Sequence, residues 1–81
     1  MAILIPTYDL AQEIGTEIEI DVTTVGELLA IGCERWGKPF EDTVRAAAIV
    51  VNGRAITRLK GKRTPLGPDD TVWLVNAAAG G

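Results

Sequence analysis

One helical pattern, with strand patterns on both sides of it, narrows the folds open to this chain. Thr24 and Glu27 have the spacing of a capping box, in which the threonine hydroxyl caps the first turn and the glutamate reaches back to the cap. Apolar or small residues then recur at offsets of three and four on one face: Val25, Leu28, Leu29, Gly32 and Trp36. Gly37 is placed to end the helix. A single amphipathic helix covers one face of a small sheet, which predicts two layers.

Two strand patterns precede this helix. Residues 2–5 are a short apolar run, and residues 17–22 alternate strictly between acidic and aliphatic side chains. Such alternation is typical of a half-buried antiparallel strand. Residues 9–16 are expected to form the turn of a hairpin between the two strands, with Leu10 and Ile14 tucked beneath it.

A second hairpin is predicted after the helix. The apolar run within residues 48–56 is interrupted by Asn52-Gly53, and this dipeptide is the strongest short signal for a type I′ turn, which needs positive φ at both positions. Turn-forming residues follow at 64–70, including a proline placed for the second position of a tight turn. The last strand is predicted at residues 71–75.

The order of these elements predicts an α+β fold of the β-grasp type. If the first and last strands lie side by side in the centre of the sheet they run parallel, and the helix supplies the crossover. We expect a mixed sheet of about five strands with one main helix packed on one face. Residues 38–46 show no clear pattern beyond Phe40 as an apolar anchor, and are expected to be a helical turn or a loop. Residues 1–76 are assigned to the domain and 77–81 to a flexible C-terminal tail.

The inventory of reactive side chains argues against an enzyme that works alone. The sequence has a single cysteine, Cys33, and no histidine. An internal disulfide, a zinc site of Cys and His, and a nucleophile activated by imidazole are therefore excluded within one chain. We expect no catalytic residues, no metal and no bound cofactor, and Cys33 is interpreted as a small buried residue at the edge of the helix's apolar face.

Charge is divided unevenly along the chain. Residues 1–42 carry nine acids and two bases, a net −7, whereas residues 43–81 carry six bases and two acids, a net +4. The basic residues gather around the second hairpin: Arg54, Arg58, Lys60, Lys62 and Arg63. A solvated edge that protects an exposed strand is the favoured interpretation. Nucleic-acid binding is a minor alternative, since the overall balance is acidic and the basic run contains no aromatic residue.

No apolar run approaches the roughly 20 residues of a transmembrane helix, so no membrane partner is expected. Nor does a charged leader with an apolar region follow Met1. A cytoplasmic location is the expectation.

The last five residues are the small side chains Ala77-Ala78-Ala79-Gly80-Gly81. Counted with Asn76, they reach roughly 20 Å when extended, and glycines without Cβ atoms can pass through a narrow cleft. We therefore expect the carboxylate of Gly81 to be the reactive group, presented to the active site of another protein.

These motifs, taken in order, make the chain resemble the ThiS/MoaD family of ubiquitin-like sulfur carriers. The residues that carry the resemblance are Thr24–Leu29, Val50–Gly53, Thr64–Val72 and Ala79–Gly81. The opening Ile5-Pro6-Thr7 resembles carriers that serve cysteine biosynthesis. Ala77-Ala78 depart from the family pattern, where prolines or bulky aliphatic residues commonly precede the two glycines.

The resemblance implies a mechanism in which partner enzymes act on the carrier. An E1-like adenylating enzyme would join the Gly81 carboxylate to AMP at the expense of ATP, and sulfur from a donor would then displace AMP to leave a thiocarboxylate on Gly81. A sulfur-accepting enzyme of molybdopterin, thiamine or cysteine biosynthesis would take up that sulfur. Two other functions stay open: a protein modifier joined through Gly81 to lysines, and a binding domain whose tail is inert.

The resemblance also implies an interface with the partner enzymes. In similar β-grasp proteins, the corresponding positions of the last strand point away from the helix, which would expose Trp73 and Val75, with Val50 and Leu4 nearby. An exposed apolar patch of this kind usually marks an interface. The alternative is that Trp73 lies in the core and Leu74 points outward.

Overall fold

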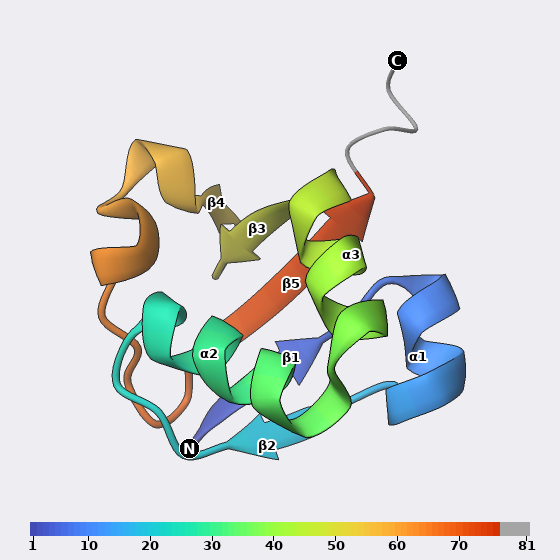
Figure 1. Cartoon of the computed structure of the whole chain (residues 1–81). Coiled ribbons are helices and arrows are strands. Elements are labelled where there is room, and N and C mark those ends of the chain that lie inside the picture. The colour runs from blue at the N-terminus through green and yellow to red at the C-terminus, as the bar shows by residue number, and fades with distance from the viewer. Residues whose placement is uncertain (77–81) are drawn as a thin grey trace.

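The computed structural model describes residues 1–76 and shows a mixed sheet of five strands with helices packed in front of it (Figure 1). The strands are β1 (Ala2–Ile5), β2 (Ile18–Ile20), β3 (Ala47–Val51), β4 (Arg54–Ala55) and β5 (Thr71–Asn76). The helices are α1 (Tyr8–Ile14), α2 (Val25–Trp36) and α3 (Lys38–Ala46), with 3₁₀ turns η1 (Ile56–Arg58) and η2 (Gly61–Arg63). The predicted tail, residues 77–81, lies outside the described residues.

The strand order is β2-β1-β5-β3-β4, with β1 and β5 parallel and the other neighbours antiparallel. The two strands that are farthest apart in the sequence therefore pair at the centre of the sheet. The connection between the two halves runs through α2, which supplies the crossover that parallel pairing needs. The predicted β-grasp architecture is confirmed.

The core lies between the sheet and α2. On α2, Val25, Leu28 and Leu29 are buried as the helical pattern predicts, and Trp36 is half-buried. The helix begins as expected, because the Glu27 amide donates to Thr24 Oγ1 at 3.1 Å. The Glu27 carboxylate, however, accepts from the Thr23 amide at 2.9 Å, so it satisfies the residue before the cap rather than the cap itself.

The segment predicted to be a plain turn between the first two strands is the helix α1, and that prediction is wrong. Thr7 caps α1, since the Leu10 amide donates to Thr7 Oγ1 at 3.3 Å, and Gly15 ends the helix with φ of +107°. Leu10 is 2 % exposed and anchors the helix to the core. β1 and β2 nevertheless pair antiparallel, so only the form of their connection differs from the prediction.

The segment 38–46, expected to be a helical turn or a loop, is the nine-residue helix α3. Phe40 anchors it as predicted and is fully buried. Its ring occupies the space that a side chain on Gly32 of α2 would fill: a Cβ on Gly32 would lie 2.8 Å from Phe40 Cε1 and closer still to Cε2 and Cζ. The Phe40 ring also packs on Trp36, with 5.4 Å between the ring centroids. The absence of a side chain at Gly32 thus allows α3 to dock on α2.

The second hairpin has the predicted turn, because Asn52 and Gly53 have φ of +50° and +86°. A hydrogen-bond brace ties this turn to the start of β5. Asn52 Nδ2 donates to Asp70 Oδ1 at 2.8 Å, and the Thr71 amide donates to Asn52 Oδ1 at 3.0 Å. None of the helices in residues 1–76 has the length and apolar character needed to cross a membrane.

Candidate functional site

The side chains of β5 alternate between the core and the surface. Val72 and Leu74 are 0 % and 3 % exposed, whereas Trp73 and Val75 are 46 % and 45 % exposed. Because successive side chains of a strand point to opposite faces, Trp73 and Val75 share the face of the sheet that the helices leave uncovered. The predicted orientation of both residues is confirmed, and the alternative with Trp73 in the core is wrong. Their role in binding a partner stays a prediction.

Trp73 has apolar neighbours on both adjacent strands. It pairs with Ile5 of β1 on one side and with Val50 of β3 on the other, and both are half-buried. Directly opposed residues in adjacent strands place their side chains on the same face. Ile5, Val50, Trp73 and Val75 therefore form one apolar surface, which we call the outer patch.

Leu4 was expected to lie near this surface, and that prediction is wrong. Leu4 is fully buried and pairs with Val72, so its side chain points to the core face of the sheet. Ile5, one residue later, takes the outward position that was assigned to Leu4. The parallel register between β1 and β5 decides which of the two faces outward, and a shift of one residue would reverse it.

The predicted reactive residues follow β5 directly in the sequence. Ala77, Ala78, Ala79, Gly80 and Gly81 lie outside the described residues. The strand that carries Trp73 and Val75 ends at Asn76, one residue before this segment. A protein that holds the outer patch therefore also holds the strand from which residue 77 continues.

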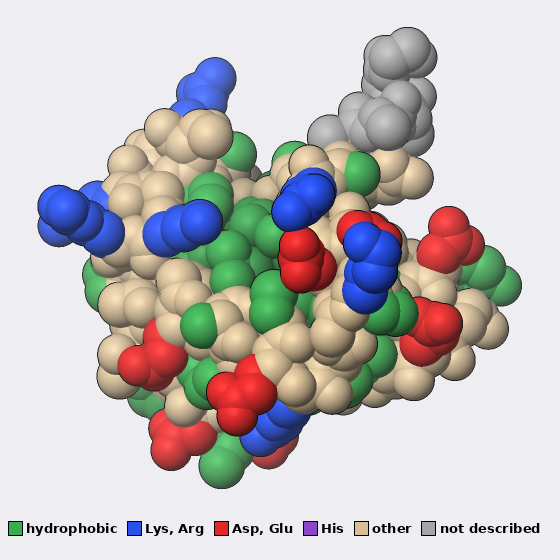
Figure 2. Space-filling model, viewed as in Figure 1, with side chains coloured by type: hydrophobic (Ala, Val, Ile, Leu, Met, Phe, Trp, Pro, Cys, Tyr) green, Lys and Arg blue, Asp and Glu red, His purple; other side chains and the backbone are tan. Residues whose placement is uncertain are grey.

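One group of basic side chains gathers over the side of the molecule that carries η1 and η2, while acidic side chains lie below this group and on the other side of the same view (Figure 2). Among residues 1–76, ion pairs join Lys38 to Asp42 and Arg45 to Glu41, and none involves the basic cluster. Three members of that cluster line one cavity of about 700 Å³: Arg54, Arg58 and Lys60. Sequence reasoning found the cluster but not the cavity.

Other reactive groups are sparse in the described part of the chain. Cys33, expected to be a small buried residue, is half-buried and borders a hollow between α2 and α3. Residues 1–76 contain no group of three or more His, Cys, Asp or Glu side chains placed to hold a metal ion. Two hydrogen bonds lower the pKa of the Asp70 carboxyl below its ordinary value. The larger effect comes from the Gly67 amide and the smaller from the Asn52 side chain.

Comparison with known proteins assigns the family. The model of the ThiS family matches residues 8–81, which is nearly the whole chain. A search among curated proteins finds no match. The matched region includes the capped helix α2, the second hairpin, β5 and the terminal glycines, the same segments on which the resemblance in the sequence depends. The chain therefore belongs to the ThiS family, a family of small ubiquitin-like proteins that in general carry sulfur and are not enzymes.

Proposed function

We propose that this protein carries sulfur as a thiocarboxylate on Gly81. The observation that carries the proposal is the family match, which extends to Gly81 and so includes both glycines. ThiS family proteins generally work with E1-like enzymes and sulfur-accepting enzymes. The carrier itself needs no catalytic residue and no bound cofactor, since the partner adenylating enzyme consumes the ATP and the partner enzymes supply the catalytic groups.

The chemistry requires activation because a carboxylate has no good leaving group. A Gly81 carboxylate oxygen attacks the α-phosphorus of ATP on the E1-like enzyme, and pyrophosphate leaves. Hydrosulfide then attacks the acyl carbon, and AMP leaves with the bonding electron pair. The product is a nucleophilic sulfur on a protein handle, ready for a biosynthetic enzyme of the molybdopterin, thiamine or cysteine type. Because adenylation consumes ATP, the proposal places the protein in the cytoplasm.

The outer patch is proposed as the surface that partner enzymes recognise. Trp73 combines a large apolar area with few rotatable bonds, and such side chains are enriched at the energetic centres of interfaces. Nearly half of its surface and of that of Val75 is exposed in the isolated chain, which leaves apolar area to bury on binding. Since the tail continues from the same strand, docking at the patch would hold the tail in register with the enzyme's active site.

Intact mass spectrometry tests the chemistry. The protein is incubated with an E1-like enzyme from the same genome, ATP and a sulfur donor. The proposal predicts a mass increase equal to the replacement of one oxygen by sulfur, and fragmentation should locate it at Gly81. A variant lacking Gly80 and Gly81 should show no such increase. Lysine-linked conjugates would instead identify a protein modifier. An unchanged mass would identify an inert tail, provided that the same enzyme preparation adenylates a known carrier protein.

The interface is tested by Trp73→Ser, with Tyr8→Ser as the matched control. Tyr8 is also an exposed aromatic residue, 80 % exposed, but it lies on α1 and outside the outer patch. Removal of an interface hot spot costs 2 kcal/mol or more, which is roughly a 30-fold loss of affinity. We therefore expect Trp73→Ser to raise the Kd for the adenylating enzyme about 30-fold and Tyr8→Ser to change it less than about twofold. Equal effects of the two variants would rule out the patch as the docking surface.

A further inference from the structure

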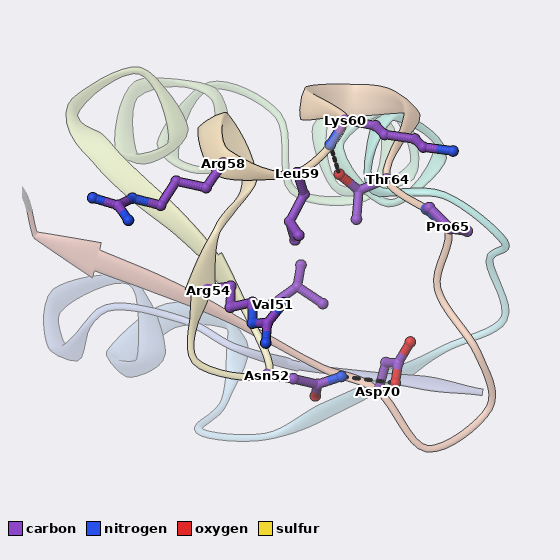
Figure 3. A pocket seen from close by; sticks show the side chains of 9 residues that line it. All are labelled: Val51, Asn52, Arg54, Arg58, Leu59, Lys60, Thr64, Pro65 and Asp70. Atoms are coloured by element: carbon purple, nitrogen blue, oxygen red, sulfur yellow. Dashed lines mark hydrogen bonds between the residues drawn. The ribbon is translucent and has the colours of Figure 1, made fainter.

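The cavity beside the basic cluster has the form of a binding site for a small molecule. It lies between the β3–β4 hairpin and the 3₁₀ segment, where Val51 and Leu59 point toward one another across it (Figure 3). Its volume of about 700 Å³ falls in the range of pockets that hold small organic ligands. Val51 pairs with Val72 on the core face of the sheet, whereas Val50 pairs with Trp73 on the opposite face. The cavity and the outer patch are therefore on opposite sides of the sheet.

Hydrogen bonds fix the walls of this cavity. Thr64 is 4 % exposed, and its hydroxyl accepts from the Lys60 amide at 3.1 Å and donates to the Gly61 carbonyl at 2.7 Å. These bonds close the turn of residues 60–64, which directly follows Leu59. On the other side, the brace between Asn52 and Asp70 holds the hairpin turn (Figure 3). The two walls are thus formed before any ligand arrives, which lowers the entropy lost on binding.

The charge of the cavity favours an anion. Arg54, Arg58 and Lys60 line it and have no ion-pair partner within residues 1–76. Asp70 also lines it, but its carboxylate already accepts from Asn52 and from the Gly67 amide. Three cations and one carboxylate leave a formal charge of +2. Arg54 is the register partner of Val51 and therefore shares its face, whereas the side chains of Arg58 and Lys60 extend away from one another (Figure 3). An anionic group would therefore meet Arg54 at the edge of the apolar interior, and the exposed side chains of Arg58 and Lys60 reach it by turning inward.

We propose that this cavity binds a small organic phosphate, with its phosphate at the cationic rim and its apolar or aromatic body between Val51 and Leu59. A phosphate monoester carries a charge of about −1.5 to −2 at neutral pH, which balances the local +2. The guanidinium groups of Arg54 and Arg58 can each donate two parallel hydrogen bonds to phosphate oxygens. The ligand would bind on the side of the sheet away from the outer patch, so that it and a partner enzyme can bind at the same time. The site depends neither on Gly81 nor on the sulfur chemistry.

Titrations of the ¹⁵N-labelled full chain with three probes test the site. Phenyl phosphate has both parts of the proposed ligand, inorganic phosphate has only the anion, and phenol has only the apolar body. We expect saturable shifts of the Arg54, Leu59 and Lys60 amides with phenyl phosphate, at a Kd about tenfold below those of the other two probes. Equal affinity for phenyl phosphate and inorganic phosphate would overturn the proposal, because a diffuse basic surface behaves in that way.

Two charge-matched variants locate the binding. Arg54→Gln removes a cation that lines the cavity, and Arg63→Gln removes one that does not. The Kd for phenyl phosphate should rise about fivefold or more in Arg54→Gln and less than about twofold in Arg63→Gln. Leu59→Ala should raise the Kd for phenyl phosphate and leave the Kd for inorganic phosphate unchanged. The amide spectrum of each variant reports whether it is folded. Equal losses in the two arginine variants would show that the cavity has no part in binding.

Discussion

Replacing Gly32 with alanine should destabilise this protein, although the same replacement stabilises most helices. Gly32 lies within α2, and alanine at a helix interior is favoured over glycine by about 1 kcal/mol. Here the added Cβ would lie 2.8 Å from Phe40 Cε1 and nearer to two further ring atoms. Carbon atoms pack at about 3.5–4.0 Å, so the ring has to move by roughly an ångström. Phe40 is fully buried, so its ring can move only if the side chains packed against it, or α3 itself, move as well.

The magnitude follows from two opposing terms. Forcing an extra methyl group into a well-packed core typically costs 1–3 kcal/mol, and this contact belongs at the upper end because three ring atoms are involved. Subtracting the gain in helix propensity of about 1 kcal/mol leaves a net loss of about 2 kcal/mol. For a domain of this size, such a loss lowers Tm by roughly 8–16 °C. The urea midpoint should fall by about 2 M if the m-value is near 1 kcal/mol/M.

Urea denaturation followed by circular dichroism at 222 nm measures this change. Ala30→Gly is the control for helix propensity, since Ala30 is an exposed residue of the same helix. This variant should lower the free energy of unfolding by about 1 kcal/mol. Phe40→Leu then removes part of the ring, and in that background Gly32→Ala should be neutral or stabilising. If Gly32→Ala raises the urea midpoint of the wild-type protein, the packing of α3 on α2 described above is wrong.

Three further changes are expected to alter stability. Thr24→Ala removes the acceptor of the Glu27 amide and should lower the free energy of unfolding by about 1 kcal/mol, measured by urea denaturation. Gly53→Ala should lower the free energy of unfolding by about 1–2 kcal/mol in the same measurement. The added Cβ meets no other atom, so this loss comes from backbone strain at φ of +86° alone. The folded pKa of Asp70 is lowered, so its stabilising contribution is present above its unfolded value near 3.8 and is lost as the pH falls through the folded value. Asp70→Asn should therefore lower the urea midpoint at pH 7 and have progressively less effect as the pH falls through the folded pKa, and a difference that does not shrink with falling pH would contradict this cause.

The parts of the fold that local patterns determine were predictable. Residues 24–37 have both a cap and a sustained helical period, and Asn52-Gly53 has a turn preference that depends on the backbone alone. The helix α1 was missed because it has only seven residues, of which Leu10 and Ile14 are the two that face the core, too few to establish a period. The helix α3 was not recognised because its main anchor, Phe40, packs into a space at Gly32 that only the tertiary structure reveals.

The candidate site was predictable to the extent that it lies on one strand. The period of β5 limited Trp73 and Leu74 to opposite faces, and the family resemblance then indicated that Trp73 points outward. The error at Leu4 concerns a register between strands separated by more than sixty residues, which no local pattern specifies. The basic cavity joins Arg54 to Thr64 and Asp70, and their proximity depends on how the 3₁₀ segment folds back onto the sheet.

The central position of β5 has a consequence for how the molecule opens. This strand is hydrogen-bonded to β1 on one side and to β3 on the other, whereas β4 has two residues and a single neighbour. Local fluctuations begin where few bonds hold a segment, and amides at the middle of a sheet exchange with solvent only when the whole domain unfolds. The edge at β4 can therefore fray while the backbone amides of Val72 and Leu74 stay protected from exchange with solvent. The strand that ends at Asn76 is thus among the last parts of the protein to open.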